Sequence, residues 1–290
     1  MSRIIASIKK YFSLVKFSHT VFAMPFAIIG FSLATSQPGQ HFSLRLLLLI
    51  ILGMVFARNS AMGFNRFTDK DFDALNPRTA SREIPSGRIN AKSAALFVLI
   101  NAVLFIITTG FINRLTLILS PVALFVILGY SLTKRITILC HFVLGLGLSL
   151  APIGAYISVT GEFNLIPLLY SFTVLTWVSG FDIIYSLQDD EFDRSAKLFS
   201  IPSSKGRRKA ISISILIHLF TLLLVVTTGI IQNAGWLYWT GAIIFSLMLV
   251  YQHLIIKPDD ISRVNLAFAT TNGFASIIYA VFVIIDLFLL

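Results

Sequence analysis

The chain has 290 residues, of which 56% are hydrophobic and only 12% are charged, and its mean hydropathy is +0.86. A soluble core of this length cannot bury so much apolar surface, so the composition indicates an integral membrane protein. The net charge of +10 would also suit a nucleic-acid partner, but we expect none, because a membrane topology explains where the basic residues lie.

Nine uninterrupted apolar segments follow one another along the chain, each near the ~20 residues that cross a hydrocarbon core. They are predicted at His19–Thr35, Phe42–Gly63, Ser93–Gly110, Leu115–Tyr130, Ile136–Val159, Leu165–Ile184, Ala210–Ile231, Trp236–Ile256 and Val264–Leu287. Membrane β-strands are not expected, because these segments do not alternate apolar and polar residues. We therefore expect an all-α integral membrane fold, a single domain over residues 1–290 in which nine transmembrane helices surround a central cavity.

Lysine and arginine gather on one side of these segments. They occupy the amino-terminal tail and the connections after the second, fourth, sixth and eighth segments, whereas Arg45 and Arg114 fall on the other side. Because basic residues collect on the cytoplasmic side, we expect a multi-pass protein of the inner (cytoplasmic) membrane. Its amino terminus would be cytoplasmic and its carboxyl terminus external.

Two acidic clusters stand out, one after the second segment and one after the sixth. Their oxygen-bearing members recur at the spacing of one helical face. They are Asn65, Asp69 and Asp73 in the first cluster, and Asp182, Tyr185, Asp189 and Asp193 in the second. Carboxylate and amide oxygens suit Mg²⁺, which binds one or two carboxylates and bridges to substrate phosphate. The clusters therefore predict a magnesium site that binds a diphosphate at the cytoplasmic face.

Basic residues at the same face would complete the binding of the diphosphate. These residues are Arg78, Arg82, Lys134 and Arg135. Arg58 lies inside the second apolar segment, where a charge is costly, so it is either functional or reaches the membrane surface from the helix end. Asp71, Asp190 and Glu191 point away from the shared faces and are expected to be solvated.

Cysteine and histidine give no sign of a metal site. Cys140 is the only cysteine, which excludes an intramolecular disulfide and a thiolate metal site. No two of the five histidines have metal-ligand spacing, so each is expected to be a surface residue or a packed polar residue. They are His19, His41, His141, His218 and His253.

The two acidic clusters lie in segments that resemble each other. Ile84-Pro-Ser follows the first cluster and Ile201-Pro-Ser follows the second, and four apolar segments separate the clusters. This pattern suggests a duplicated four-helix unit, giving two related units plus a ninth helix. The two clusters would then face each other across one cavity.

These motifs resemble those of the UbiA superfamily of intramembrane prenyltransferases. The resemblance rests on Asn65-x-x-x-Asp69-x-x-x-Asp73, Asp189-x-x-x-Asp193, Arg82-x-x-Pro85-Ser-Gly87 and Tyr130-Ser-x-x-Lys134-Arg135. The local sequence around both clusters resembles most that of bacterial 4-hydroxybenzoate polyprenyltransferase-like members. These include a branch linked to menaquinone made by the futalosine route. One departure is Arg66, since many members have Asp directly after the Asn.

The resemblance implies a reaction and a set of site residues. A polyprenyl group would pass from polyprenyl diphosphate to an aromatic acid, 4-hydroxybenzoate or a dihydroxynaphthoate-type acid, in ubiquinone or menaquinone biosynthesis. Mg²⁺ would be held by Asn65, Asp69, Asp73, Asp189 and Asp193. Arg82, Tyr130 and Lys134 would bind the diphosphate together with Arg78 and Arg135, while Arg58, Asp182 and Tyr185 would serve the acceptor or assist.

Two other functions compete with this interpretation. An ion-coupled transporter would place its carboxylates near the bilayer midplane, whereas these lie at segment ends. A CDP-alcohol phosphatidyltransferase would show one aspartate-rich motif containing Asp-Gly, and neither cluster contains that dipeptide.

Overall fold

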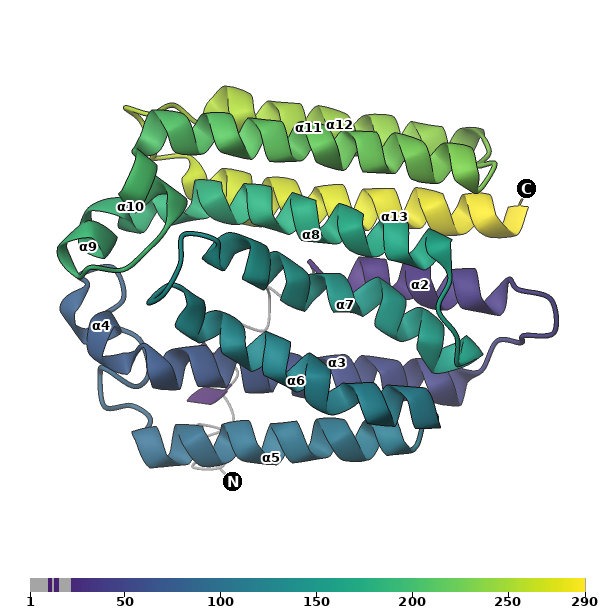
Figure 1. Ribbon diagram of the computed structural model, residues 1–290, viewed down its shortest axis with the longest axis horizontal. Helices are drawn as coiled ribbons and strands as arrows, with labels where there is room; N and C mark the ends of the chain where they lie inside the picture. Colours follow the sequence, from purple (N-terminus) through teal and green to yellow (C-terminus); the bar gives the residue numbers. More distant parts are fainter. Residues whose placement is uncertain (1–9, 12, 16–21, 290) are drawn as a thin grey trace.

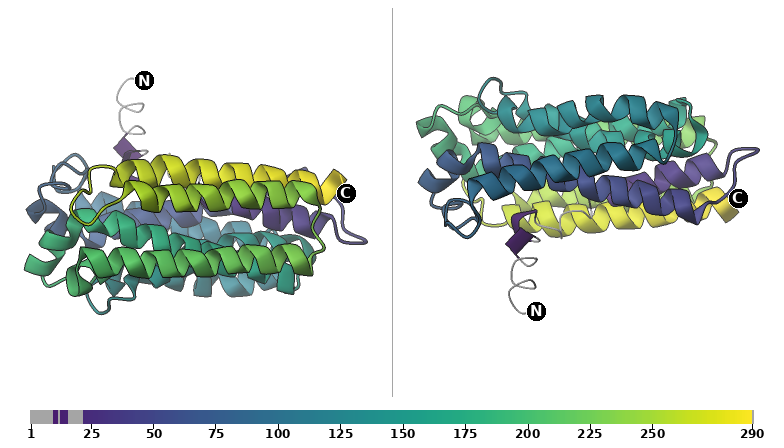
Figure 2. Two further views of the ribbon diagram at one scale, coloured as in Figure 1. Left: turned by 90° about the horizontal axis from the view of Figure 1, so that it is seen from above. Right: turned by 90° about the horizontal axis from the view of Figure 1, so that it is seen from below.

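The computed structural model describes residues 10, 11, 13–15 and 22–289, which form a helical bundle without a named strand. Eight helical segments in this part of the chain are long and apolar enough to cross a membrane. The long helices lie side by side along the longest axis (Figures 1 and 2). They are α3 (Leu44–Thr68), α5 (Ala91–Gly110), α6 (Arg114–Thr133), α7 (Cys140–Thr160), α8 (Leu165–Tyr185), α11 (Arg207–Ile231), α12 (Trp236–Ile255) and α13 (Asn272–Leu289).

Each predicted apolar segment overlaps a helix, with differences at the ends. The first corresponds to α2 (Met24–Thr35), whose 12 residues are fewer than a membrane span needs; the predicted start at His19 lies outside the described residues. α3 continues past the predicted end at Gly63 to Thr68, because its last turns place polar side chains against a cavity rather than lipid. The last predicted segment begins with a π-helix, η3 (Leu266–Thr271).

Polar side chains fix where several of these helices begin. Ser43, Asn90, Asn113 and Asn164 each accept a hydrogen bond from a backbone N–H in the first turn of the helix that follows. Such caps satisfy donors that have no partner within the helix. At the other end of α7, Gly161 adopts a φ of 73°, a left-handed conformation that favours glycine.

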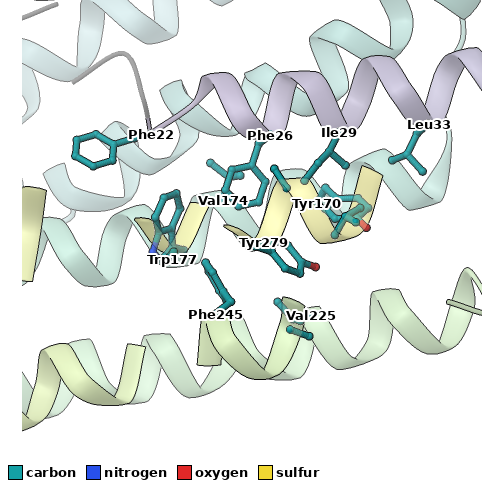
Figure 3. Packing of buried hydrophobic residues seen from close by; sticks show 14 of the residues in the cluster. Phe22, Phe26, Ile29, Leu33, Tyr170, Val174, Trp177, Val225, Phe245 and Tyr279 are labelled. Carbon is teal, nitrogen blue, oxygen red and sulfur yellow. The ribbon is translucent and has the colours of Figure 1, made fainter. Parts of the chain in front are cut away.

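An aromatic core holds the middle of the bundle together. Phe26 of α2, Trp177 of α8, Phe245 of α12 and Tyr279 of α13 point toward one another (Figure 3). The ring centroids of Phe26 and Trp177 are 5.4 Å apart, and those of Phe245 and Tyr279 are 5.1 Å apart. Many large apolar side chains are instead exposed on the outer helices, as expected of a surface that faces lipid.

Both acidic clusters lie where a long helix breaks into shorter ones. α3 gives way at Asp69 to α4 (Lys70–Leu75), and α8 gives way to a 3₁₀ turn, η2 (Ser186–Asp189), and then to α9 (Asp190–Ser195) and α10 (Ile201–Lys205). Each predicted row of oxygen ligands therefore crosses a break instead of following one continuous helix. Figure 1 shows α4, α9 and α10 at one end of the bundle and the carboxyl terminus at the other.

Candidate functional site

One cavity of about 280 Å³ lies between the two broken helix ends. Residues from α3, α4, α6, α7 and α8 and from the segments that follow α4 and α8 form its wall. Every residue predicted for the site lines it. These are Arg58, Asn65, Asp69, Asp73, Arg78, Arg82, Tyr130, Lys134, Arg135, Asp182, Tyr185, Asp189 and Asp193.

A direct contact across the cavity joins the two clusters. Arg78, which follows the first cluster, binds both carboxylate oxygens of Asp189 in the second cluster through Nε and Nη2; its Nε lies 2.9 Å from Oδ1. The Asn76 amide donates to the same oxygen at 3.0 Å. Arg78 also donates to the Tyr185 hydroxyl at 3.3 Å and lies over its ring. These contacts of Arg78 and Asn76 hold the two clusters face to face across the cavity, as expected.

Three more aspartates of the clusters, at the cavity mouth, are also paired with a lysine or an arginine. Arg82 Nη1 lies 2.6 Å from Asp73, and Arg135 Nη2 lies 3.1 Å from Asp69. Lys134 Nζ lies 2.7 Å from Asp193. Because these carboxylates are buried or partly buried, each needs a nearby positive charge. The cavity thus carries four pairs of acidic and basic groups that can bind both a cation and an anion.

The surroundings of the site shift the pKa values of several groups at the mouth, among them Asp69 and Lys134. Burial raises the pKa of Asp69 above that of an ordinary aspartate, although the hydrogen bond and the charge of Arg135 oppose this. Burial lowers the pKa of Lys134, but the charge and hydrogen bond of Asp193 outweigh burial and raise it overall. Lys134 therefore remains a cation at neutral pH.

The oxygen atoms of the clusters fit a hard divalent cation. Asp73 Oδ2 is buried without a hydrogen-bond partner among the described residues. The Asn65 amide donates to Asp69 Oδ2 at 2.9 Å, which leaves the Asn65 carbonyl oxygen for another partner. In the described part of the chain no three His, Cys, Asp or Glu side chains are close enough together to hold a metal by themselves. A metal here would share its coordination with a ligand and with water, as Mg²⁺ commonly does.

The predicted acceptor residues also line the cavity, together with three side chains to which the sequence analysis assigned no role in the site. Asp182 contacts His141, with Nδ1 2.7 Å from Oδ2. Arg58 and Arg66 also line the cavity, and the Nε atom of each is buried without a hydrogen-bond partner in the described residues. His141 and Asn76 could not be found from spacing, since their partners are 41 and 113 residues away. One feature of the sequence pointed to Arg66, namely a charged residue next to Asn65 in an apolar helix.

The acidic residues expected to be solvated divide into two groups. Asp71 and Glu191 have side chains that are 84% and 83% exposed, and both lie outside the cavity lining. The expectation was wrong for Asp190, which is buried and binds Arg207 through both carboxylate oxygens at 2.8 and 2.9 Å. The 3₁₀ turn before Asp190 changes the direction in which the Asp190 side chain points. The ion pair between Asp190 and Arg207 ties α9 to the start of α11.

The structure also shows the surroundings of the histidines and the conformation of the two Ile-Pro-Ser copies. His141 and His218 are packed polar residues, His41 is exposed, and His19 lies outside the described residues. His253 is partly buried, and its Nε2 lies 2.7 Å from His218 Nδ1. The second Ile-Pro-Ser begins α10, whereas the first lies in a run of turns, so the two copies differ in conformation.

Comparison with known proteins identifies relatives over almost the whole chain. Residues 23–278 match the model of the UbiA prenyltransferase family. A 4-hydroxybenzoate octaprenyltransferase from Aliivibrio salmonicida is 31% identical over 255 residues, 86% of either chain. The apo structure of a UbiA homolog from Aeropyrum pernix K1 has a TM-score of 0.83 at 30% identity, covering 92% of this chain and 98% of that one. A UbiA homolog from Archaeoglobus fulgidus bound to DMAPP and Mg²⁺ shares the fold, with a TM-score of 0.67 at 20% identity over 92% of this chain and 99% of that one.

Proposed function

The chain belongs to the UbiA prenyltransferase family, and from that premise we propose that it transfers a polyprenyl group from a polyprenyl diphosphate to an aromatic acid. The observation that carries this proposal is the single cavity lined by two acidic clusters and four paired cations. A relative named 4-hydroxybenzoate octaprenyltransferase supports the choice of substrates. The Archaeoglobus homolog with DMAPP and Mg²⁺ supports a diphosphate donor.

The oxygen-bearing residues of the clusters would hold Mg²⁺ in this reaction. They are Asn65, Asp69, Asp73, Asp189 and Asp193. When bound, the metal neutralises the negative charge that develops on the diphosphate as it leaves. The same residues orient the donor, because a ligand held from both cluster walls has little freedom to rotate.

The basic residues at the mouth would bind the diphosphate oxygens directly. Arg78, Arg82, Lys134 and Arg135 already contact the carboxylates there. A diphosphate would take over these cations while its Mg²⁺ takes over the carboxylates, so neither set of charges would be left unpaired. Tyr130 lies on the same wall and would add a hydroxyl donor. Together these groups stabilise charge on the leaving group, which promotes cleavage of the allylic C–O bond.

The inner part of the cavity would receive the aromatic acceptor and the start of the prenyl chain. Leu144, Leu148, Val178 and Phe181 line it there, and their apolar side chains exclude water that would compete with the acceptor. The acceptor would be 4-hydroxybenzoate or a dihydroxynaphthoate-type acid, in ubiquinone or menaquinone biosynthesis. The site would face the cytoplasm from the inner membrane. That residues 1–290 form one domain remains a prediction.

Substitution of one aspartate in each cluster tests this proposal. Asp69→Ala and Asp189→Ala should each lower prenyl transfer by at least about 100-fold, because each removes an oxygen ligand and leaves a cation unpaired. The assay would incubate membranes with labelled polyprenyl diphosphate and a panel of aromatic acids. Asp71→Ala is the matched control, since Asp71 belongs to the first cluster but lies outside the cavity lining. Wild-type turnover in either cavity variant would refute the assigned roles.

A further inference from the structure

One carboxylate of the cavity differs from those at the mouth. The four mouth aspartates each pair with an arginine or a lysine. Asp182 lines the same cavity, but its partner is the imidazole of His141, whose Nδ1 lies 2.7 Å from Oδ2. Within the described part of the chain, Oδ1 of Asp182 has no hydrogen-bond partner. Asp182 therefore presents one oxygen for which the described residues supply no donor.

The second ring nitrogen of His141 defines its tautomer. Nε2 accepts a hydrogen bond from the backbone N–H of Ile201 at 3.2 Å, so Nε2 carries no proton. Nδ1 must then carry the ring proton and donate it to Asp182. In this tautomer the imidazole donates from Nδ1 to Asp182 and accepts at Nε2 from Ile201. His141 thus orients the Asp182 carboxylate.

Asp182 lies in the part of the cavity where an aromatic ring would fit. It precedes Asp189 by seven residues, which places it roughly 10 Å farther into the bundle at a helical rise of 1.5 Å per residue. The nearby wall residues Val178 and Phe181 come from the same helix, and Leu144 comes from α7. A polar acceptor surrounded by apolar walls is typical of a site that orients a mostly apolar ligand.

We propose that Asp182 accepts a hydrogen bond from the ring hydroxyl of the aromatic acceptor, and that His141 is the positioning residue that aims this carboxylate. The inference rests on the proposed function, because it concerns the acceptor of that reaction. A hydroxyl that donates to a charged oxygen in a water-poor cavity releases electron density into its ring. The ring carbon that attacks the prenyl group becomes more nucleophilic as a result.

His141 also has a structural contact that any test must separate from this role. Through Ile201 it anchors the start of α10, and the neighbouring Ser200 donates to Asp193 Oδ2 at 3.1 Å. Substitution of His141 by Asn or by Gln separates its contact with Asp182 from its contact with Ile201, because the two side-chain amides replace different nitrogen atoms of the imidazole. Asn places an amide near Nδ1 and can still donate to Asp182. Gln places an amide near Nε2 and can still accept from Ile201.

The experiment compares H141N and H141Q with the wild type in steady-state prenyl transfer. H141Q should lower kcat/KM for the acceptor by about 10- to 100-fold, the usual effect of losing one hydrogen bond to a charged group, with KM for the prenyl diphosphate unchanged. H141N should retain acceptor kinetics close to those of the wild type. Ser179→Ala is the packing control, because Ser179 donates to the His141 carbonyl at 3.3 Å without contacting Asp182, and it should behave like the wild type.

A substrate analogue gives a second readout that separates the positioning role from a purely structural one, because a distorted cavity would also bind the analogue less well. The analogue that lacks the ring hydroxyl should inhibit wild type and H141Q equally, because it makes no hydrogen bond to Asp182. Equal losses in H141N and H141Q, losses in H141N alone, or no loss in either would overturn the proposal. A wild-type protein that prenylates no aromatic acid would instead reject the proposed function, which is a separate result.

Discussion

At the scale of single residues, Arg66 is the side chain whose placement most needs an explanation. It is 5% exposed, it lines the cavity, and its Nε has no hydrogen-bond partner among the described residues. A buried guanidinium without a carboxylate against it destabilises the folded protein. Such a charge is retained where it binds an anion, and the diphosphate proposed for this cavity is one.

Replacing Arg66 with an apolar residue should therefore have opposite effects on stability and activity. Arg66→Met should raise the free energy of unfolding by about 1 kcal/mol, since it removes a buried and unsatisfied cation. Prenyl transfer should fall, with a higher KM for the diphosphate. Thermal unfolding in detergent and steady-state kinetics measure the two effects. A variant that loses stability as well as activity would show that Arg66 is a structural residue.

The site residues illustrate how far residue spacing can go. Asn65, Asp69 and Asp73 lie within one short stretch, so their spacing alone predicts that they share one wall of a site. His141 offered no such signal, because it reaches Asp182 only through the packing of α7 against α8. Asp190 was predicted wrongly for a related reason, since the 3₁₀ turn that redirects it depends on tertiary contacts. Residue spacing predicts which side chains lie close together along one helix, but it cannot predict contacts between different helices.

At the scale of helices, close approach between α7 and α8 positions one wall of the cavity. A Cβ atom on Gly145 would lie 2.4 Å from the backbone oxygen of Leu175, so α7 and α8 touch where α7 has no side chain. Gly154, farther along α7, would place its Cβ in open space. Small residues permit helices to pack closely in membranes. The order of the helices and the approximate bounds of most of them followed from hydropathy, but the short α2, these contacts and the helix breaks did not.

The two glycines give a matched pair of substitutions with opposite expected signs. Gly145→Ala should lower the free energy of unfolding by about 1–3 kcal/mol, because its methyl group overlaps a backbone atom of α8. Gly154→Ala should leave it unchanged or raise it by up to about 1 kcal/mol, because alanine favours a helix. Thermal unfolding of the two purified variants in one detergent measures both. Similar midpoints would mean that α7 and α8 are not held at this distance.

At the scale of the whole molecule, the bundle has two unlike ends. One end carries the acidic clusters and the short helices α4, α9 and α10, and the carboxyl terminus lies at the other end (Figure 1). The distribution of Lys and Arg in the sequence predicts that the end with the clusters faces the cytoplasm. This orientation would give the site access to donors and aromatic acids made inside the cell.

Cysteine labelling tests the orientation with little background, because the only natural cysteine, Cys140, is buried. Asp71→Cys should react with a membrane-impermeant maleimide only in inverted vesicles, since Asp71 lies at the cluster end and is exposed. Glu162→Cys, in the exposed connection between α7 and α8, should react only from the outside of intact cells. The reverse pattern would invert the topology and place the cavity on the external face.

The central claim is that both acidic clusters hold one magnesium-bound diphosphate. Equilibrium binding of a labelled prenyl diphosphate to the purified protein tests it most directly, with Mg²⁺ or with EDTA, for the wild type, Asp69→Asn and Asp189→Asn. We predict tight binding only for the wild type with Mg²⁺, and loss of that binding in either variant. Wild-type affinity in EDTA, or in a variant of one cluster, would contradict the account.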